Sequence, residues 1–271
     1  MFRPILVPVC LFLAVAQLQA GNIFLTVDAA DHCSGITNEI AGNSLAGHWS
    51  ANPAPCTFSA PHASESGAAS ATADYGHLSA SSAAVDSLFN VGQNGAVGAG
   101  DAYAQAKFYD VITIANGPAS AYLRMFYTFS YSGYLNPGTG TTGNSFGARA
   151  QIGTTNLNAS SSVAGTWNGA LSGFVDYTLS NSRTIVTGLV DGSTHCNVET
   201  YSSDSCSVSS SVDLIMTGWQ VLDSNLAVVA DATIQAESGA GYDAPEPTSA
   251  ALLIAATGLA GVVFMYRCKR G

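Results

Sequence analysis

The feature that most restricts the fold is a two-residue alternation in the stretch from Asp101 to Ala115, DAYAQAKFYDVITIA. Up to Phe108, small or apolar side chains occupy every second position, and larger polar or aromatic side chains lie between them. A strand places successive side chains on opposite faces of a sheet, whereas a helix would distribute this pattern around its axis. The stretch therefore predicts a β-strand with one face toward a core and the other toward solvent.

Similar segments recur along the chain, separated by clusters of Gly, Ser, Asn and Thr. The strands expected are Ala69–Ala80, Asp101–Ala115, Ala121–Leu135, Phe146–Ile152, Phe174–Leu179, Arg183–Val190, Val212–Leu222 and Leu226–Gln235. The last two flank Asp223-Ser224-Asn225, which predicts a hairpin turn. Cys33–Ala68 shows no alternation and holds many Gly and Pro residues, so we expect a disulfide-pinned loop region there. The fold class predicted is all-β, an antiparallel two-sheet sandwich, jelly-roll-like, formed as one domain by residues 21–236.

Charge is scarce and unevenly distributed. Only 10% of the 271 residues are charged, and all 18 acids lie between Gly21 and Pro247. The cations in that part of the chain are Lys107, Arg124, Arg149 and Arg183. Such an acidic surface repels phosphate backbones, so no nucleic-acid partner is expected, whereas polysaccharide or divalent cations remain compatible with it. No cofactor is expected, and calcium stays speculative because no D-x-D-x-D-G loop is present.

The N-terminus has the pattern of a secretory signal peptide over residues 1–20. Arg3 precedes an apolar stretch, and small residues at Ala16 and Ala20 fit a cleavage site. The alternative, a buried N-terminal strand or helix, is disfavoured because polarity changes abruptly at Gly21. The body of the protein is therefore expected to be exported.

The C-terminus predicts a single transmembrane helix. Residues 249–266 carry no charge, and at about 1.5 Å per residue they would span about 27 Å of hydrocarbon. A basic tip at 267–271 follows at once, which holds that end on the cytoplasmic side. A core helix of a soluble domain would normally carry a polar face, which this segment lacks.

Residues 245–271 together resemble the PEP-CTERM sorting signal of Gram-negative bacteria, after a linker at 237–244. The motif itself is Pro245-Glu246-Pro247, and the basic tip contains Arg267, Lys269 and Arg270. The resemblance implies recognition by an exosortase, a membrane-embedded transpeptidase, followed by release to the cell surface or an exopolysaccharide matrix. Cys268 departs from the usual run of arginines, although the charge of the tip is kept.

Two other interpretations of this tail stay open. A GPI signal also combines small residues, a spacer and an apolar tail, but it normally ends without a basic cluster. A permanent membrane anchor would need no PEP motif. The two prolines keep the preceding residues extended, which would suit either a protease or a plain linker.

Four cysteines belong to the exported part: Cys33, Cys56, Cys196 and Cys206. An even number in an oxidising compartment predicts two disulfides, and local pairing gives Cys33–Cys56 and Cys196–Cys206. A zinc site built from these cysteines and their neighbouring histidines is less favoured. The spacing has no C-x-x-C pattern, and adjacent side chains in a strand point to opposite faces.

Catalytic motifs occur only in a context that argues against them. Gly138–Gly143 fits G-x-G-x-x-G but leads into a predicted strand rather than a helix. Gly143–Gly147 fits G-x-S-x-G around Ser145, with Asp176, Asp191 and His195 downstream, yet a nucleophile elbow also requires a following helix. No catalytic residue or metal site is therefore assigned.

The sequence thus predicts an exported, non-enzymatic cell-surface or extracellular-matrix protein associated with exopolysaccharide. The alternative is a carbohydrate-binding module, in which Tyr131, Tyr134 and Trp167 lie near turn-rich segments and contact glycan. A secreted hydrolase is the less favoured alternative.

Overall fold

The alternating stretch from Asp101 to Ala115 lies within β7 (Ala96–Ala115), a central strand of one of two antiparallel sheets. The structure is a computed structural model and describes residues 24–33, 36–44, 47–89, 96–118, 121–138, 143–200 and 203–240. Ala102, Ala104, Ala106 and Phe108 are buried, while the residues between them are only partly buried. The predicted strand and its inward face are confirmed.

The first sheet has the strand order β10-β9-β12-β7-β1-β2, and β14 pairs with β7 beside that path. Its strands are β1 (Phe24–Cys33), β2 (Ile36–Ser44), β7 (Ala96–Ala115), β9 (Ser145–Ile152), β10 (Thr155–Ser161), β12 (Arg183–Thr200) and β14 (Thr233–Ala236). We call it sheet 1.

The second sheet, sheet 2, has the order β11-β8-β13-β6-β5-β3, and β4 pairs with β5. Its strands are β3 (His48–Ala51), β4 (Cys56–Ala60), β5 (Ala63–Asp74), β6 (His77–Leu88), β8 (Ala121–Asn136), β11 (Gly165–Thr178) and β13 (Asp204–Asp223). From β6 onward, the chain crosses between the two sheets repeatedly.

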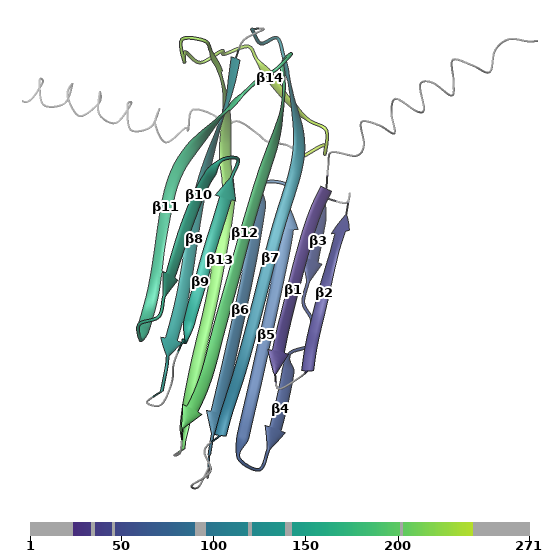
Figure 1. The fold of residues 1–271 in the computed structure, drawn as a ribbon. Coiled ribbons are helices and arrows are strands. Elements are labelled where there is room, and N and C mark those ends of the chain that lie inside the picture. The colour runs from purple at the N-terminus through teal and green to yellow at the C-terminus, as the bar shows by residue number, and fades with distance from the viewer. Residues whose placement is uncertain are drawn as a thin grey trace, which may run out of the picture.

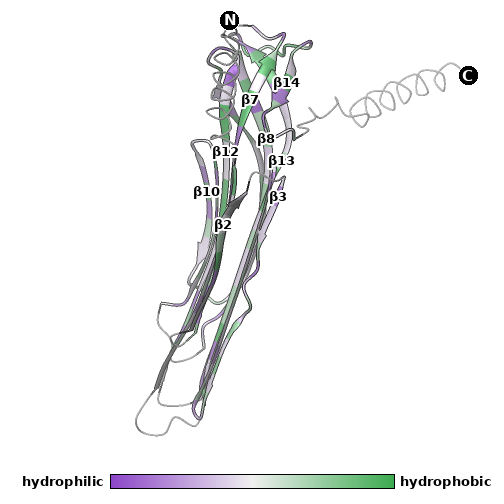
Figure 2. Ribbon diagram, turned by 90° about the vertical axis from the view of Figure 1, so that its right-hand side faces the viewer, coloured by the Kyte–Doolittle hydropathy of each residue, from purple (hydrophilic) through white to green (hydrophobic). Residues whose placement is uncertain are grey.

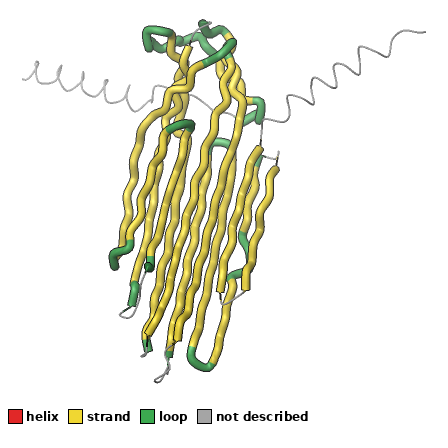
Figure 3. Tube along the Cα trace, viewed as in Figure 1, coloured by secondary structure: helices red, strands yellow, loops and turns green. Residues whose placement is uncertain are grey.

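The two sheets pack face to face as long, narrow layers (Figures 1 and 2). β7 and β13 each contain 20 residues, which corresponds to a sandwich about 65 Å long at about 3.3 Å per residue. Figure 3 shows strands joined by loops, with no helix in the described part of the chain. The predicted all-β sandwich of two antiparallel sheets is therefore confirmed.

Alanines and glycines let aromatic rings fill the space between the sheets. Phe146 of sheet 1 lies over Gly133 of sheet 2, where a Cβ atom would come within 2.3 Å of the ring. Within sheet 1, Phe108 covers Gly188, where a Cβ would come within 2.4 Å. A larger residue at either glycine would displace a buried ring, so these glycines are required by packing.

Cys33–Ala68 is not the loop region that was expected. It contains the strands β2, β3, β4 and the start of β5. Pro53 and Pro55 lie between β3 and β4, where no ladder hydrogen bond is lost. These short strands lie at or beside the sheet edges, where hydrophobic alternation is weak, and this explains why the sequence did not reveal them.

Two strand predictions are also corrected. Ala69–Ala80 is not one strand, because the chain turns at Tyr75-Gly76, where Gly76 has a φ of 92°. The turn after Asp223 is present, and the Asp223 carboxylate accepts hydrogen bonds from Asn225 N and Ala227 N at 2.8 and 2.9 Å. The predicted hairpin is confirmed only as a short antiparallel bridge between Leu222 and Val228, with Asp223 N donating to Ala227 O at 2.9 Å. The strand that follows is β14, which pairs with β7 in the other sheet.

Candidate functional site

Two disulfides connect the sheets near one end of the sandwich. Cys33 of β1 bonds to Cys56 of β4, and Cys196 of β12 bonds to Cys206 of β13, with Cα–Cα distances of 6.0 and 5.8 Å. Each pair joins sheet 1 to sheet 2, and all four cysteines are buried. The predicted local pairing is confirmed. We call this region the disulfide end.

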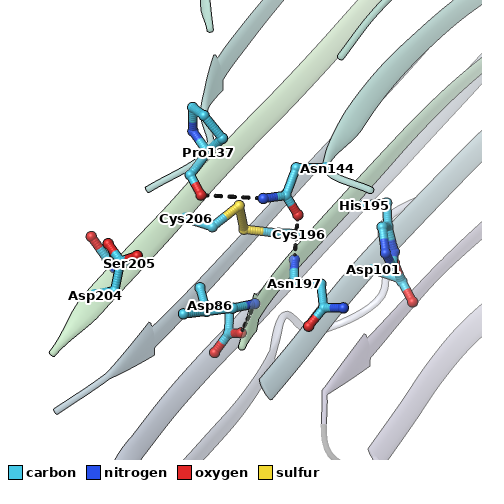
Figure 4. The surroundings of a disulfide bond; sticks show 11 residues. Asp86, Asp101, Pro137, Asn144, His195, Cys196, Asn197, Asp204, Ser205 and Cys206 are labelled. Atoms are coloured by element: carbon cyan, nitrogen blue, oxygen red, sulfur yellow. Dashed lines mark hydrogen bonds and ion pairs between the residues drawn. A yellow bond between two sulfur atoms is a disulfide. The ribbon is translucent and has the colours of Figure 1, made fainter. Parts of the chain in front are cut away.

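A buried carboxylate lies close to the Cys196–Cys206 bond (Figure 4). Asp86 of β6 is fully buried, and its Oδ2 accepts a hydrogen bond from the backbone N–H of Val198 on β12 at 3.0 Å. The pKa of Asp86 is raised to about 6, mainly by burial and to a smaller extent by the neighbouring Glu65. Hydrogen bonds from the backbone N–H groups of Val198 and Ser87 oppose this rise.

Asn144 connects two segments at the same end of the sandwich (Figure 4). Its Nδ2 donates to Pro137 O at 3.2 Å, and its Oδ1 accepts from Asn197 N at 2.6 Å. The side chain is almost fully buried, so both hydrogen bonds are protected from water. Asn144 therefore fixes the segment after β8 to β12, a role that its place in the G-x-S-x-G match did not indicate.

Ser145, His195 and Asp101 occupy neighbouring strands on the outer face of sheet 1. Ser145 opens β9 and pairs in register with His195, which pairs with Asp101 of β7. His195 Nδ1 is hydrogen-bonded to Asp101 Oδ1. Sequence reasoning had named Ser145 and His195 but had missed Asp101, because the register that joins distant strands is not visible in the sequence.

The two acids considered for a hydrolase lie elsewhere. Asp176 is on sheet 2, where Arg124 binds it through Nε and Nη2 at 2.7 Å each. Asp191 lies four residues before His195 on β12 and is 3.9 Å from Arg149. Burial raises the pKa of Asp191, and Arg149 opposes that rise. The side chains of Asp101 and His195 are 47% and 42% exposed, so water would weaken the polarising effect that buried triads exert.

The three aromatic residues predicted to contact glycan do not form one surface. Tyr134 is exposed on the outer face of sheet 2, whereas Trp167 points to the opposite face, because its neighbour Thr166 pairs with Tyr134. Tyr131 packs against the core and lies over Gly169, where a Cβ would come within 2.8 Å of its ring. A single flat sugar platform formed by all three is incompatible with this arrangement.

A different aromatic patch lies on the outer face of sheet 2. Phe174 of β11 is 52% exposed and contacts Phe126 of β8 edge-to-face, with ring centroids 6.2 Å apart. Arg124 Cζ lies 4.0 Å above the Phe174 ring while its guanidinium binds Asp176. We call Arg124, Phe126, Phe174 and Asp176 the Phe174 patch. An exposed ring beside a fixed, polar ion pair is the combination that sugar rings and hydroxyls can contact.

The end of the described chain is docked onto β7. β14 pairs with Ala115–Ile112, and Glu237 N then donates to Val111 O at 2.9 Å. Ser238 N and Oγ both donate to the buried carboxylate of Asp110, the former at 3.2 Å. Arg183 forms an ion pair with Glu237. We call residues 233–238 the docked segment.

The docked segment meets the start of the described chain. Phe24, the first residue of β1, pairs with Tyr109 and stacks on its ring at 4.4 Å. Ser238 lies beside Asp110, the next residue of β7. β12 occupies the other side of β7 at this level, so β14 and β1 follow one another along the same edge.

The predicted sorting residues Pro245, Glu246, Pro247, Arg267, Lys269 and Arg270 lie outside the described residues. In the part that the structure does describe, no helix is long and apolar enough to cross a membrane. Nor do three or more His, Cys, Asp or Glu side chains gather there as a group that could hold a metal ion.

No protein-family model matches this chain, and no curated protein proved similar to it.

Proposed function

We propose that this chain is an exported protein of the cell surface or extracellular matrix, sorted by a PEP-CTERM-type signal and associated with exopolysaccharide. The observation that carries export is the pair of buried disulfides joining the two sheets. Such bonds persist in oxidising compartments and are rare where cytosolic thiols keep cysteines reduced. The excess of acidic over basic residues between Gly21 and Pro247 is consistent with this location.

The docked segment supports the proposed sorting step. Six residues lie between Ser238 and Pro245, and the seven steps from one to the other can span at most about 25 Å at about 3.5 Å per residue. A sandwich connected to the membrane span by so short a linker would remain close to the membrane until an exosortase-type enzyme cut near Pro245–Pro247. The span at 249–266 and the jelly-roll-like connectivity of the sandwich belong to the same proposal.

Mass spectrometry of the mature protein from its native host tests this function. We expect an N-terminus near Gly21 and a C-terminus near Pro247. A mature chain that retains the tail through Gly271 would reduce the proposal to a permanent membrane anchor. A chain that keeps its first 20 residues and has free thiols at all four cysteines would contradict export altogether.

Carbohydrate binding is the second candidate, and the Phe174 patch is the observation that favours it. A pull-down on the host exopolysaccharide, with Phe174→Ala compared with Ile215→Ala, separates a specific site from general adhesion. Ile215 is a suitable control because it is an exposed apolar residue of the same sheet but lies on β13, which is separated from β11 by β8. Equal retention of both variants would exclude the patch as a glycan site.

A further inference from the structure

β11 (Gly165–Thr178) is a long edge strand of sheet 2. It pairs with β8 on one side and is the last strand in the order of the sheet. Its register with β8 runs without a break through all 14 residues. The sequence GTWNGALSGFVDYT contains no proline and no lysine. Proline, lysine and bulges are among the features by which proteins prevent edge strands from pairing with other chains, and β11 has none of these three.

The other edges of the sandwich are better protected. β10 has only seven residues and exposes asparagines, and β2 carries the exposed Glu39. β3 and β4 have four and five residues and are separated by Pro53 and Pro55. Among the described strands, β11 is therefore the long edge most open to a further strand.

Sheet 1 leaves part of the inner face of β11 uncovered. Its edge strand β10 packs against β8, so Leu171 and Trp167 remain 51% and 41% exposed although they point to the core side of sheet 2. Near its C-terminal end β11 does meet sheet 1, where Tyr177 Oη donates to Thr187 O at 3.4 Å. The uncovered apolar surface thus lies along the first two thirds of the strand.

We propose that β11 pairs with β11 of a second copy of this chain, antiparallel, so that sheet 2 continues across both molecules. Two identical strands related by a twofold axis present the same surface to each other, as a closed homodimer requires. The two paired strands would form roughly one backbone hydrogen bond for each pair of opposed residues. The two Leu171 and two Trp167 side chains would also lose exposure to water.

The charge of β11 permits pairing with a second copy, and the area that pairing would bury determines how strong the dimer is. The chain carries a net charge of −10, so copies repel each other in general, but the single charge on β11 is Asp176, which Arg124 already binds. An edge about 46 Å long and about 10 Å deep would bury on the order of 900 Å² in total, which corresponds to a weak, reversible dimer. Molecules held on one surface would associate more readily because their local concentration is high.

The test measures the mass of the full-length protein in detergent micelles by sedimentation across a wide dilution series. We expect the wild type to shift from one to two copies per particle as its concentration rises. Leu171→Lys places a charge on the core side of the edge, and Ala170→Lys places one on the outer side of the same strand. Both variants should stay at the mass of one copy at every concentration.

Ile215→Lys is the matched control, because Ile215 is also exposed but lies on β13, which is paired on both sides. It should dimerise as the wild type does. A wild type that stays at one copy throughout would overturn the proposal. Dimerisation of both β11 variants at wild-type strength would overturn it too, and would locate the association elsewhere, such as in the apolar tail. Circular dichroism of each variant confirms that a lost dimer is not a lost fold.

Discussion

The Asp86 carboxylate of sheet 2 accepts a hydrogen bond from the backbone N–H of Val198 in sheet 1, at 3.0 Å, in a fully buried position. One side chain thus joins the two layers within the disulfide end, beside the covalent link between Cys196 and Cys206. Burying a carboxylate is costly, because the ionised form loses its hydration and Glu65 lies nearby. The energetics of this end should therefore depend on pH.

Asp86→Asn should flatten the pH dependence of stability. The folded-state pKa of Asp86, about 6, lies above the ordinary value near 3.9, so its contribution is fully present at low pH and is lost as pH rises through about 6. The amide keeps an acceptor for Val198 N and cannot ionise. We expect the variant to exceed the wild type in unfolding free energy by on the order of 2 kcal/mol at pH 8 and to approach it near pH 4. Urea unfolding at several pH values measures this difference in unfolding free energy.

Asp28 and Asp191 also have raised pKa values, but they are present in both proteins, so the difference between the two pH profiles isolates Asp86. Parallel pH profiles for the two proteins would refute the assignment.

Removing either disulfide should destabilise the sandwich. The bonds close loops with sequence separations of 23 and 10 residues, and the chain-entropy relation assigns each roughly 3 kcal/mol, slightly more for the longer loop. The double variants Cys33→Ser/Cys56→Ser and Cys196→Ser/Cys206→Ser test each bond separately by thermal unfolding. If reduction leaves the melting temperature of the wild type unchanged, the cysteines are not paired in the native protein.

Substitution by alanine should lower the stability of the protein at one glycine of β12 but not at another. A Cβ at Gly188 would lie 2.4 Å from the Phe108 ring, whereas at Gly192 the nearest atom is 3.6 Å away. Gly188→Ala should therefore cost about 1–3 kcal/mol by displacing a buried ring. Gly192→Ala should be neutral or slightly stabilising, because it only restricts the unfolded chain. Chemical denaturation of both variants provides the comparison, and equal stabilities would show that Phe108 does not require the glycine.

Ser238→Ala should loosen the docked segment without unfolding the sandwich, because the backbone pairing of β14 with β7 remains. The change removes the hydroxyl that donates to Asp110 and leaves a buried carboxylate with one partner fewer. We expect hydrogen exchange to accelerate in β14 and to remain slow in β7 and β12. Ser224→Ala, in the exposed turn after β13, is the control. Unchanged exchange in β14 would show that the Asp110 contact does not hold the segment.

The sequence revealed β7 because one of its faces is buried and the other partly exposed, so that alternation follows directly from burial. β1 (Phe24–Cys33) alternates between buried and partly exposed residues in the same way, but it was not among the expected strands. Edge strands such as β2 and β4 carry no such pattern, and the sequence therefore predicted a loop there. Which strands become neighbours within a sheet could not be predicted from the sequence. That Asp101 would lie beside His195, or that β14 would join β7 instead of β13, depends on contacts between residues far apart in the chain. The sequence did not indicate the Phe174 patch, because Phe126 and Arg124 come beside Phe174 and Asp176 only through the register of β8 with β11.

β14 and β1 together form the neighbour of β7 along one edge, with Ser238 beside Asp110 and Phe24 opposite Tyr109. In the hydrogen-bonding pattern of sheet 1, β14 and β1 take the place of one continuous strand, although no peptide bond joins them. The fold is thus a nearly closed circle in its connectivity, and a circular permutant that joins these ends would preserve every strand. The described chain therefore begins and ends beside the same part of β7, away from the disulfide end of the sandwich.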